Sequence, residues 1–247
     1  MNISLIIPCY NEETNLQKGV LDKIGNFTKD DNRFLEVLIV DDGSTDQSKE
    51  IVKKKYLSRF SKFKLIENNH QGKAFAIITG IKKSLGEIII FSDMDLATPI
   101  DEIEKLLIET KKGFPIVIGS RNTTREGAPI MRKVMAVGFI YIRDLLIGLH
   151  GIKDTQCGFK LFNKKAANRI INRLKVFHER RKAKGSSVTA GFDLEFLFLA
   201  NKLGYKIKEV PVIWKHVETK NVNFASDSVE TLKDILLIKY YDLKKKY

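Results

Sequence analysis

Two aspartates, Asp93 and Asp95, lie two residues apart in the segment Ser92 to Leu96, which follows the apolar run 87–91. Such a run predicts a buried strand, at whose end both carboxylates can point towards one bound ion. A hard divalent cation prefers oxygen ligands and shares its coordination shell with substrate phosphates. In an open α/β sheet, ligands bind beyond the carboxyl ends of the strands. The pair therefore predicts a metal-bound diphosphate; the alternative is that it only caps the helix that begins near Pro99.

Polar residues also follow two other predicted strands. The first cluster contains Pro8, Tyr10, Asn11 and Glu12, and the second is the segment Asp41-Asp42-Gly43-Ser44-Thr45-Asp46. Because the carboxyl ends of parallel strands meet at one edge of a sheet, three such clusters would converge on one crevice. Taken alone, Asp42 and the residues after it also suit a turn and a helix N-cap, and Tyr10 could simply pack.

The first 120 residues alternate between predicted strands and predicted helices. Strands are predicted at 3–7, 34–40, 63–67, 87–91 and 115–119, and helices from about residue 12 and at 46–56, 73–84 and 100–111. Near-continuous Ile, Val and Leu strands separated by helices are typical of a parallel sheet covered on both faces. The predicted fold class is therefore α/β.

The second half is less regular. We expect a long apolar helix at 131–149, a strand at 157–162, a mobile polar loop at 176–189, a helix at 192–203, an alternating strand at 205–214 and a final helix at 226–241. The sequence contains no internal repeat and no linker-like stretch that would divide it. We therefore expect a single domain over residues 1–247, with two halves that meet near residue 120.

Composition limits the classes of protein to which the chain can belong. Its 247 residues, 43% hydrophobic and 30% charged, are typical of a globular domain. Cys9 and Cys157 form no disulfide framework and no zinc pattern, and neither a signal peptide nor a membrane-spanning run is visible. The net charge of +13 indicates an anionic partner: nucleic acid, an acidic membrane surface or a phosphorylated substrate. Nucleic acid is the least supported, because no nucleic-acid-binding motif is present.

The order of the three strand-end motifs resembles that of family 2 inverting glycosyltransferases, which have the GT-A fold. The motifs are Pro-x-Tyr-Asn-Glu-Glu from residue 8, Asp-Asp-Gly-Ser-Thr-Asp from residue 41 and Asp-x-Asp from residue 93. Segments 119–121, 154–162 and 191–195 are similar to polyprenyl-phosphate glycosyltransferases. Segments 209–214 and 226–228 are similar to the dolichyl-phosphate β-glucosyltransferase branch of that group.

This resemblance implies a donor site in residues 1–120. Pro8, Tyr10, Asn11 and Glu12 would line the nucleoside pocket, Glu12 would bind the ribose hydroxyls, and Asp42 would bind the base edge, expected to be uracil. Asp93 and Asp95 would hold Mg²⁺ or Mn²⁺ against the diphosphate. Lys73 would pair with a phosphate oxygen, or would only begin a helix.

The resemblance also implies an acceptor site in residues 121–247. Arg121 would bind the acceptor phosphate or be a surface charge, and Arg132 and Lys133 would bind a lipid headgroup or only snorkel at a helix end. Asp154 matches the family's candidate base. A lipid phosphate is already an anion at neutral pH, because its second pKa is about 6, so Asp154 would instead orient the acceptor or the sugar. A hydroxyl acceptor would need a base.

The expected function is transfer of a hexose, foremost glucose from UDP-glucose, to dolichyl or another polyprenyl phosphate. The protein would be cytoplasmic and peripheral on the cytosolic face of a membrane, held by an amphipathic surface, a partner subunit or a homo-oligomer. Alternatives are a GDP-mannose-dependent mannose synthase, transfer to a glycan hydroxyl, and a non-catalytic nucleotide-sugar-binding module. Ala97 counts against the mannose synthase, which has Gln there, and intact Asp93 and Asp95 count against a non-catalytic module.

Overall fold

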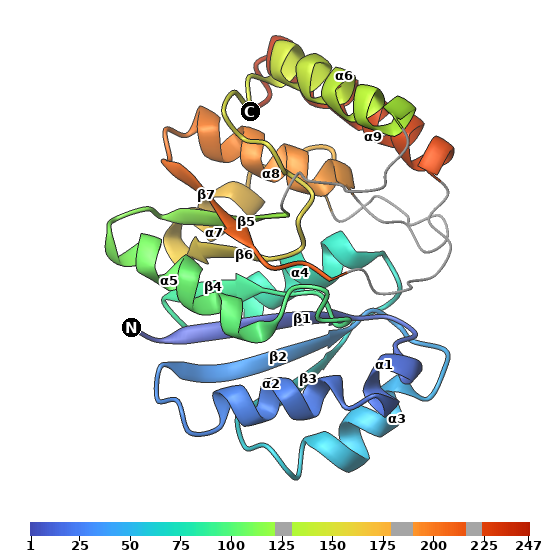
Figure 1. Ribbon diagram of the computed structural model, residues 1–247, viewed down its shortest axis with the longest axis vertical. Helices are drawn as coiled ribbons and strands as arrows, with labels where there is room; N and C mark the ends of the chain where they lie inside the picture. The colour runs from blue at the N-terminus through green and yellow to red at the C-terminus, as the bar shows by residue number, and fades with distance from the viewer. Residues whose placement is uncertain (122–129, 179–189, 216–223) are drawn as a thin grey trace.

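The computed structural model describes residues 1–121, 130–178, 190–215 and 224–247 (Figure 1). The strands are β1 (Ile3–Cys9), β2 (Phe34–Asp41), β3 (Phe63–Glu67), β4 (Ile88–Phe91), β5 (Ile116–Arg121), β6 (Lys160–Asn163) and β7 (Ile207–Val212). The first-half helices are α1 (Glu13–Gln17), α2 (Val20–Thr28), α3 (Ser48–Ile51) with its continuation η1 (Val52–Tyr56), α4 (Lys73–Lys83), η2 (Ile100–Glu102) and α5 (Ile103–Lys111). The later helices are α6 (Ile130–Ile147), α7 (Lys164–Ile171), α8 (Ala190–Lys202) and α9 (Phe224–Leu243).

The strands form one seven-stranded sheet in the order β3-β2-β1-β4-β6-β5-β7. Neighbouring strands are parallel except around β6, which runs antiparallel to both β4 and β5. The carboxyl ends of β1, β2, β3 and β4 therefore lie side by side at one edge. The predicted α/β class with a mostly parallel sheet is confirmed.

Helices cover both faces of the sheet because alternate strand residues point to opposite sides. On one face, Ile6 of β1 packs in a cluster with residues of α4, α7, α8 and α9. On the other face, Ile3, Leu5 and Ile7 of the same strand pack with residues of α2, η1 and α5. The strands are thus apolar on both sides, which is why they appear as continuous hydrophobic runs in the sequence.

The structure departs from the sequence-based expectations at several elements. The helix expected from residue 12 is two helices, α1 and α2, separated by Gly19 in the left-handed conformation (φ 74°). The strand expected at 157–162 is displaced to Lys160–Asn163, and helix α7 directly after it was not expected. Asn163 caps α7 by accepting a hydrogen bond from the backbone N–H of Lys165 at 2.9 Å. Most of the expected loop, residues 179–189, lies outside the described residues.

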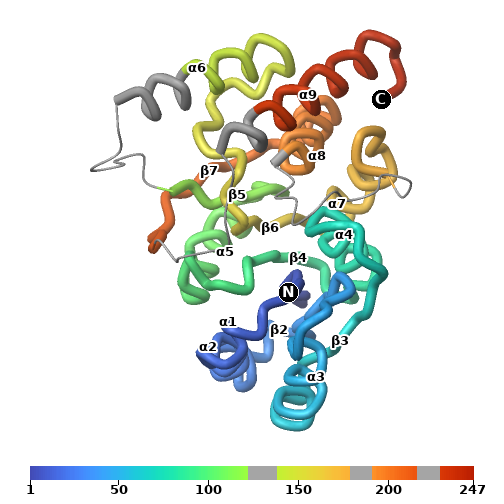
Figure 2. The backbone as a smooth tube through the Cα atoms, turned by 90° about the vertical axis from the view of Figure 1, so that its right-hand side faces the viewer, coloured from blue at the N-terminus to red at the C-terminus, as the bar shows by residue number. Residues whose placement is uncertain are grey.

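Helices α6 and α9 lie side by side beyond α8, on the side of the molecule away from β3 (Figures 1 and 2). This layer carries many exposed apolar side chains, among them Tyr141 and Leu145 of α6 and Leu236, Tyr240 and Leu243 of α9. Within the described ranges, no helix combines the length and the apolarity that spanning a bilayer requires.

Candidate active site

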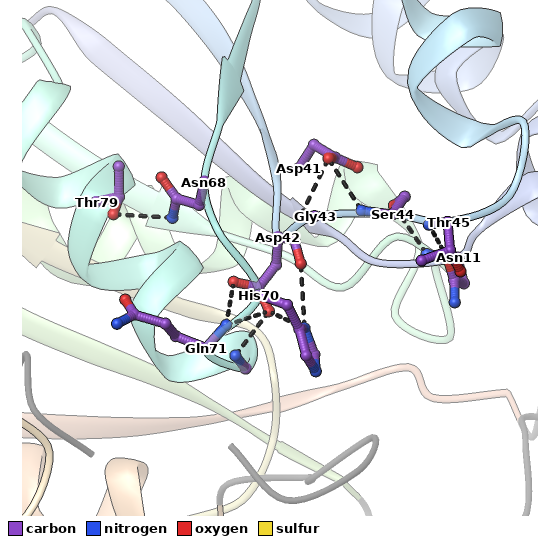
Figure 3. A network of polar contacts seen from close by, with 11 residues as sticks. Asn11, Asp41, Asp42, Gly43, Ser44, Thr45, Asn68, His70, Gln71 and Thr79 are labelled. Carbon is purple, nitrogen blue, oxygen red and sulfur yellow. Dashed lines mark hydrogen bonds and ion pairs between the residues drawn. The ribbon is translucent and has the colours of Figure 1, made fainter. Parts of the chain in front are cut away.

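The segments that follow β1 and β2 are joined by hydrogen bonds (Figure 3). Asn11, in the left-handed conformation (φ 52°), accepts hydrogen bonds from the backbone N–H groups of Thr45 and Asp46 at 2.8 and 3.3 Å. Its own N–H donates to the Ser44 hydroxyl at 3.0 Å. Asn and Asp tolerate this conformation better than other residues with side chains, because their short polar groups can bond locally. The sequence-predicted Asn11 therefore holds the two strand-end segments together.

The other residues predicted to line a nucleoside pocket lie around this junction. Pro8 is buried inside β1, paired with Val40 of β2. The backbone N–H of Glu12 donates to the Ser48 hydroxyl at 2.7 Å, and the Glu12 carboxylate accepts from the Asn15 amide at 2.6 Å. The structure thus brings these residues to the same sheet edge, and their contacts with a nucleoside stay predictions.

Asp42 lies at the end of β2 with its carboxylate turned towards the N-terminus of α4. The carboxylate accepts hydrogen bonds from the backbone N–H groups of Gln71 (3.1 Å) and Gly72 (2.6 Å). It also accepts from Nδ1 of His70 at 2.8 Å, and the His70 ring stacks on Tyr10 with 4.1 Å between ring centroids. Only 2% of the Asp42 side chain is exposed. The sequence motifs predicted Asp42 and Tyr10 in this region, but they did not predict His70, which is 28 residues from Asp42.

The Asp-x-Asp pair follows β4, next to the start of α4. Asp93 Oδ1 lies 2.5 Å from the ammonium of Lys73, the first residue of α4. Burial lowers the pKa of Lys73, but the charge and the hydrogen bond of Asp93 outweigh burial, so the net pKa is raised. Asp95 accepts a hydrogen bond from the backbone N–H of Ala97 at 2.9 Å. Burial, with a smaller contribution from the Asp93 charge, raises the pKa of Asp95.

The carboxylates of Asp93 and Asp95 fit a divalent cation that is shared with a diphosphate. Asp93 Oδ1 is buried, and it contacts the ammonium of Lys73. The chain passes Asp93 closely at Gly158, where an added Cβ would lie 2.1 Å from Asp93 Oδ2. Among the described residues, no three His, Cys, Asp or Glu side chains gather closely enough to hold a metal. Mg²⁺ is commonly bound by one or two carboxylates plus phosphates and water, which matches this pair.

Arg121 and Asp154 form a tight ion pair on the other side of Asp93. Two guanidinium nitrogens of Arg121 bind the two Asp154 oxygens at 2.7 and 2.8 Å, and the Arg121 backbone N–H donates at 3.0 Å. Burial raises the pKa of Asp154, but the hydrogen bonds and charge of Arg121 outweigh it, so the net pKa lies below its usual value. A carboxylate with a lowered pKa is a weak base.

A cavity of about 50 Å³ lies beside Asp93 and Arg121. It is lined by Ser92, Asp93, Ala97, Thr98, Arg121, Gln156, Cys157, Gly158, Phe159 and Trp214. The guanidinium of Arg121 lies over the Trp214 ring, 5.9 Å from its centroid. The predicted Arg121 and Asp93 therefore line one small space, at the ends of β4 and β5.

A second charged pair lies buried behind Lys73 and was not found from the sequence. Lys160 of β6 donates to Asp193 of α8 at 2.8 Å and also to the backbone carbonyl of Cys157. Burial raises the pKa of Asp193 although the Lys160 and Lys73 charges oppose it. The residues of this pair are 33 positions apart, and a lysine inside an apolar strand gives no sign of its partner.

The remaining predicted acceptor residues are Arg132 and Lys133. Both belong to α6, and their side chains lie outside the described residues. Their predicted contact with an acceptor phosphate therefore stays a prediction.

Comparison with known proteins identifies the family. Residues 4–171 match glycosyl transferase family 2, a span that contains all three strand-end motifs, Arg121 and Asp154. The chain is a family 2 glycosyltransferase. The resemblance inferred from the motifs is thereby confirmed.

Curated relatives of this family 2 glycosyltransferase include several dolichyl-phosphate beta-glucosyltransferases. The chain is 36% identical over 235 residues to ALG5A of Trichomonas vaginalis, covering 90% of this chain and 68% of that protein. It is 32% identical to the Saccharomyces cerevisiae enzyme and 33% identical to the Homo sapiens enzyme, covering 96% of this chain and 74% of each relative. The glycosyltransferase thus resembles the dolichyl-phosphate beta-glucosyltransferases over nearly its whole length.

Solved structures support the fold. Glucosyl-3-phosphoglycerate synthase from Mycobacterium tuberculosis, in complex with Mn²⁺ and UDP-glucose, superposes with a TM-score of 0.68 at 20% identity, covering 96% of this chain and 78% of that chain. The same enzyme with Mg²⁺ and UDP gives a TM-score of 0.67 at 17% identity. At this level of sequence identity, the similarity shows a shared GT-A-like α/β fold and nothing finer.

Proposed function

We propose that this glycosyltransferase transfers glucose from UDP-glucose to dolichyl phosphate or a related polyprenyl phosphate, with inversion at the anomeric carbon. The observation that carries the proposal is the cavity in which Asp93 of the donor side and Arg121 of the acceptor side face each other. The names of the curated relatives support this pair of substrates. A structural neighbour that was solved with UDP-glucose and Mn²⁺ supports the class of donor.

The donor would lie along the carboxyl ends of β1 to β4, over residues 1–120. Tyr10, Asn11 and Glu12 would contact the nucleoside, and Asp42 would act at the base end. The diphosphate would reach Asp93, Asp95 and Lys73 at the end of β4 and the start of α4. A bound Mg²⁺ or Mn²⁺, held by Asp93 and Asp95, would supply positive charge against the diphosphate.

The acceptor phosphate would enter the cavity at Arg121, in the half of the chain from residue 121 onwards. A guanidinium carries five N–H donors; Nε and one Nη nitrogen of Arg121 bind Asp154, which leaves the N–H groups on the opposite edge for a phosphate. A phosphate oxygen then attacks C1 of glucose as the bond between C1 and the diphosphate oxygen breaks, and UDP leaves with the electron pair. Because the attacking oxygen is already anionic, Asp154 serves by orienting Arg121 and removes no proton.

The exposed layer of α6 and α9 would bring the site to the lipid. Tyr141 and Leu145 of α6 and Leu236 and Leu243 of α9 are exposed, and Lys244 to Lys246 follow directly after α9. Apolar side chains flanked by lysines are typical of a surface that docks on an anionic membrane. We propose that the protein works as a peripheral enzyme on such a surface.

Transfer from a panel of radiolabelled nucleotide sugars to polyprenyl phosphate in detergent tests the proposal. Incubations contain Mg²⁺, Mn²⁺ or EDTA, and an Asp95→Ala variant serves as the inactive control. We expect a lipid-soluble product from UDP-glucose that depends on the metal and is absent with Asp95→Ala. A product from GDP-mannose alone would indicate the mannose synthase. UDP release without any lipid product would indicate a glycan hydroxyl as the acceptor.

A further inference from the structure

His70 and Tyr10 form a stacked pair of rings across the end of β2. Tyr10 follows β1 and His70 follows β3, the two strands that flank β2 in the sheet. Their ring centroids are 4.1 Å apart and the ring planes differ by 15°. Asp42, at the end of β2, points its carboxylate at the His70 ring (Figure 3). Three neighbouring strands thus place one imidazole in a defined position at the nucleoside end of the proposed site.

The contacts of His70 show that its Nδ1 carries a proton. Nδ1 lies 2.8 Å from the Asp42 carboxylate and 3.1 Å from the Asp42 carbonyl oxygen. Both partners are acceptors, so Nδ1 must be the donor. In a neutral imidazole, Nε2 then carries a lone pair and can accept a hydrogen bond. Within the described part of the chain, Nε2 has no hydrogen-bond partner, and 31% of the His70 side chain is exposed.

Asp42 itself is poorly placed to contact a ligand. Its side chain is 2% exposed, and its carboxylate already accepts from Gln71, Gly72 and His70. The backbone at His70 also packs closely on Gly43, where an added Cβ would lie 2.9 Å from the His70 backbone nitrogen. Gly43 adopts the left-handed conformation (φ 74°), which other residues rarely adopt. The segment that carries His70 is therefore fixed in place, and the His70 ring is the partly exposed partner of the buried Asp42 carboxylate.

We propose that His70 selects the base of the donor nucleotide, its Nε2 accepting the N3–H of uracil, and that Asp42 is the positioning residue that fixes its tautomer. This inference rests on the proposed function and assigns the base contact to His70 instead of Asp42. Uracil has a hydrogen-bond donor at N3, whereas cytosine has an acceptor there. A site built to bind an N–H group rejects an analogue that lacks it, because the acceptor of the site is left unpaired.

Binding of UDP, CDP and N3-methyl-UDP, measured by calorimetry with Mg²⁺ present, tests this contact. The variant is His70→Phe, which keeps an aromatic ring against Tyr10 and removes both ring nitrogens. We expect wild type to bind UDP about tenfold more tightly than CDP or N3-methyl-UDP, the usual effect of one lost hydrogen bond. We expect His70→Phe to bind UDP and N3-methyl-UDP within about twofold of each other. Thermal unfolding of both proteins verifies that the variant is folded.

The outcomes separate this inference from the proposed function. If wild type prefers UDP and His70→Phe keeps the full penalty for N3-methyl-UDP, the base contact belongs to another group and the inference is overturned while the proposed function stands. If wild type does not bind UDP, both are overturned.

The tautomer of His70 in the wild-type protein gives a second readout, one that does not depend on how well His70→Phe folds. Nitrogen NMR of the ¹⁵N-labelled wild type is expected to show a protonated Nδ1 and an unprotonated Nε2 for His70. Loss of this pattern in Asp42→Asn would support the positioning role. A His70 that is protonated at Nε2 alone in wild type would overturn the inference.

Discussion

At the scale of single residues, Lys73 occupies the position that a cation would take beside Asp93. Its ammonium lies 2.5 Å from Asp93 Oδ1, which is buried. If Asp93 holds a metal ion, as we propose, the ion has to displace this ammonium from the carboxylate, whereas a bound diphosphate would gain a positively charged partner. Lys73 should therefore oppose metal binding alone and favour nucleotide binding.

Lys73→Met separates these two effects because it keeps the length of the side chain and removes the charge. We expect the affinity for Mn²⁺ without nucleotide to rise about fivefold to tenfold and the affinity for UDP to fall about tenfold. Electron paramagnetic resonance measures free Mn²⁺, and calorimetry measures UDP. Lys83→Met, on the exposed last turn of α4, is the matched control and should change neither affinity. A parallel fall of both affinities would contradict the interpretation.

The ion pair of Arg121 and Asp154 has a defined dependence on pH. The pKa of Asp154 in the folded protein is lowered, so the pair contributes stability above the unfolded-state pKa of about 3.9. This contribution is lost as the pH falls through the folded-state pKa. We expect Asp154→Asn to lower the free energy of unfolding by about 1–3 kcal/mol at pH 7 and by much less near pH 2. Urea unfolding at both pH values measures this, and an equal loss at both would contradict it.

The residues of the site differ in how well they could be predicted. Asp93, Asp95, Arg121 and Asp154 follow strands or stand in recognisable motifs, so their types and places were accessible from the sequence. Lys160 and His70 were not, because each acquires its role from a partner that only the fold brings near. Asp42 was predicted to bind the base, and its enclosure by the amides of residues 71 and 72 depends on the turn before α4.

At the scale of elements, the segment Gly191 to Glu195 holds α8 to three neighbours. An added Cβ at Gly191 would lie 2.0 Å from Asp234 of α9, so the glycine permits the two helices to pack. Asp193 binds Lys160 of β6. Glu195, fully buried, accepts hydrogen bonds from the backbone N–H groups of residues 175, 176 and 177 at 2.6, 2.8 and 2.9 Å. In the sequence, this motif was notable only for its resemblance to the family. In the structure, it joins α8 to α9, to β6 and to the segment 175–177.

Glu195→Gln tests this junction. The amide has one carbonyl acceptor for donors that now share a carboxylate, so buried N–H groups lose their partner. We expect the free energy of unfolding to fall by about 1–3 kcal/mol, measured by urea unfolding at pH 7. Glu50→Gln on the surface of α3 is the matched control, expected to stay within about 0.5 kcal/mol. Similar losses in both variants would contradict the role of Glu195.

The mispredictions of β6 and α7 each have a physical reason. Strand β6 is buried on both faces, so its sequence lacks the alternation that marks a face, and its antiparallel direction depends on which neighbours it meets. Helix α7 follows β6 without a loop, so the sequence shows no turn segment between the apolar strand and the start of the helix. Asn163 as an N-cap was the signal that could have revealed it.

At the scale of the whole molecule, the proposed nucleotide end and the proposed lipid end lie far apart. The nucleoside end would lie at β1 to β3, and the apolar layer of α6 and α9 lies at the opposite end (Figure 1). The cavity at Asp93 and Arg121 lies at the ends of β4 and β5, in the middle of this arrangement. The donor and the lipid phosphate would thus approach the reaction centre from opposite directions.

Sedimentation with anionic vesicles tests the docking surface. The substitutions Leu145→Glu in α6 and Leu236→Glu in α9 each place a charge on an exposed position. Each variant would lose the burial of one leucine side chain in the membrane interface. We expect each variant to bind vesicles about tenfold more weakly. Leu85→Glu, exposed before β4, is the matched control and should bind as wild type does. Unchanged binding of both α6 and α9 variants would contradict the proposed surface.

The most direct test of the central claim compares two acceptors that differ only in the phosphate group. The rate of glucose transfer from UDP-glucose is measured with dolichyl phosphate and with dolichol, in the same detergent and with Mg²⁺. The arrangement of Arg121 and Asp154 predicts a glucolipid from dolichyl phosphate and none from dolichol. Equal transfer to dolichol, or release of UDP with no lipid product from either, would contradict a phosphate acceptor.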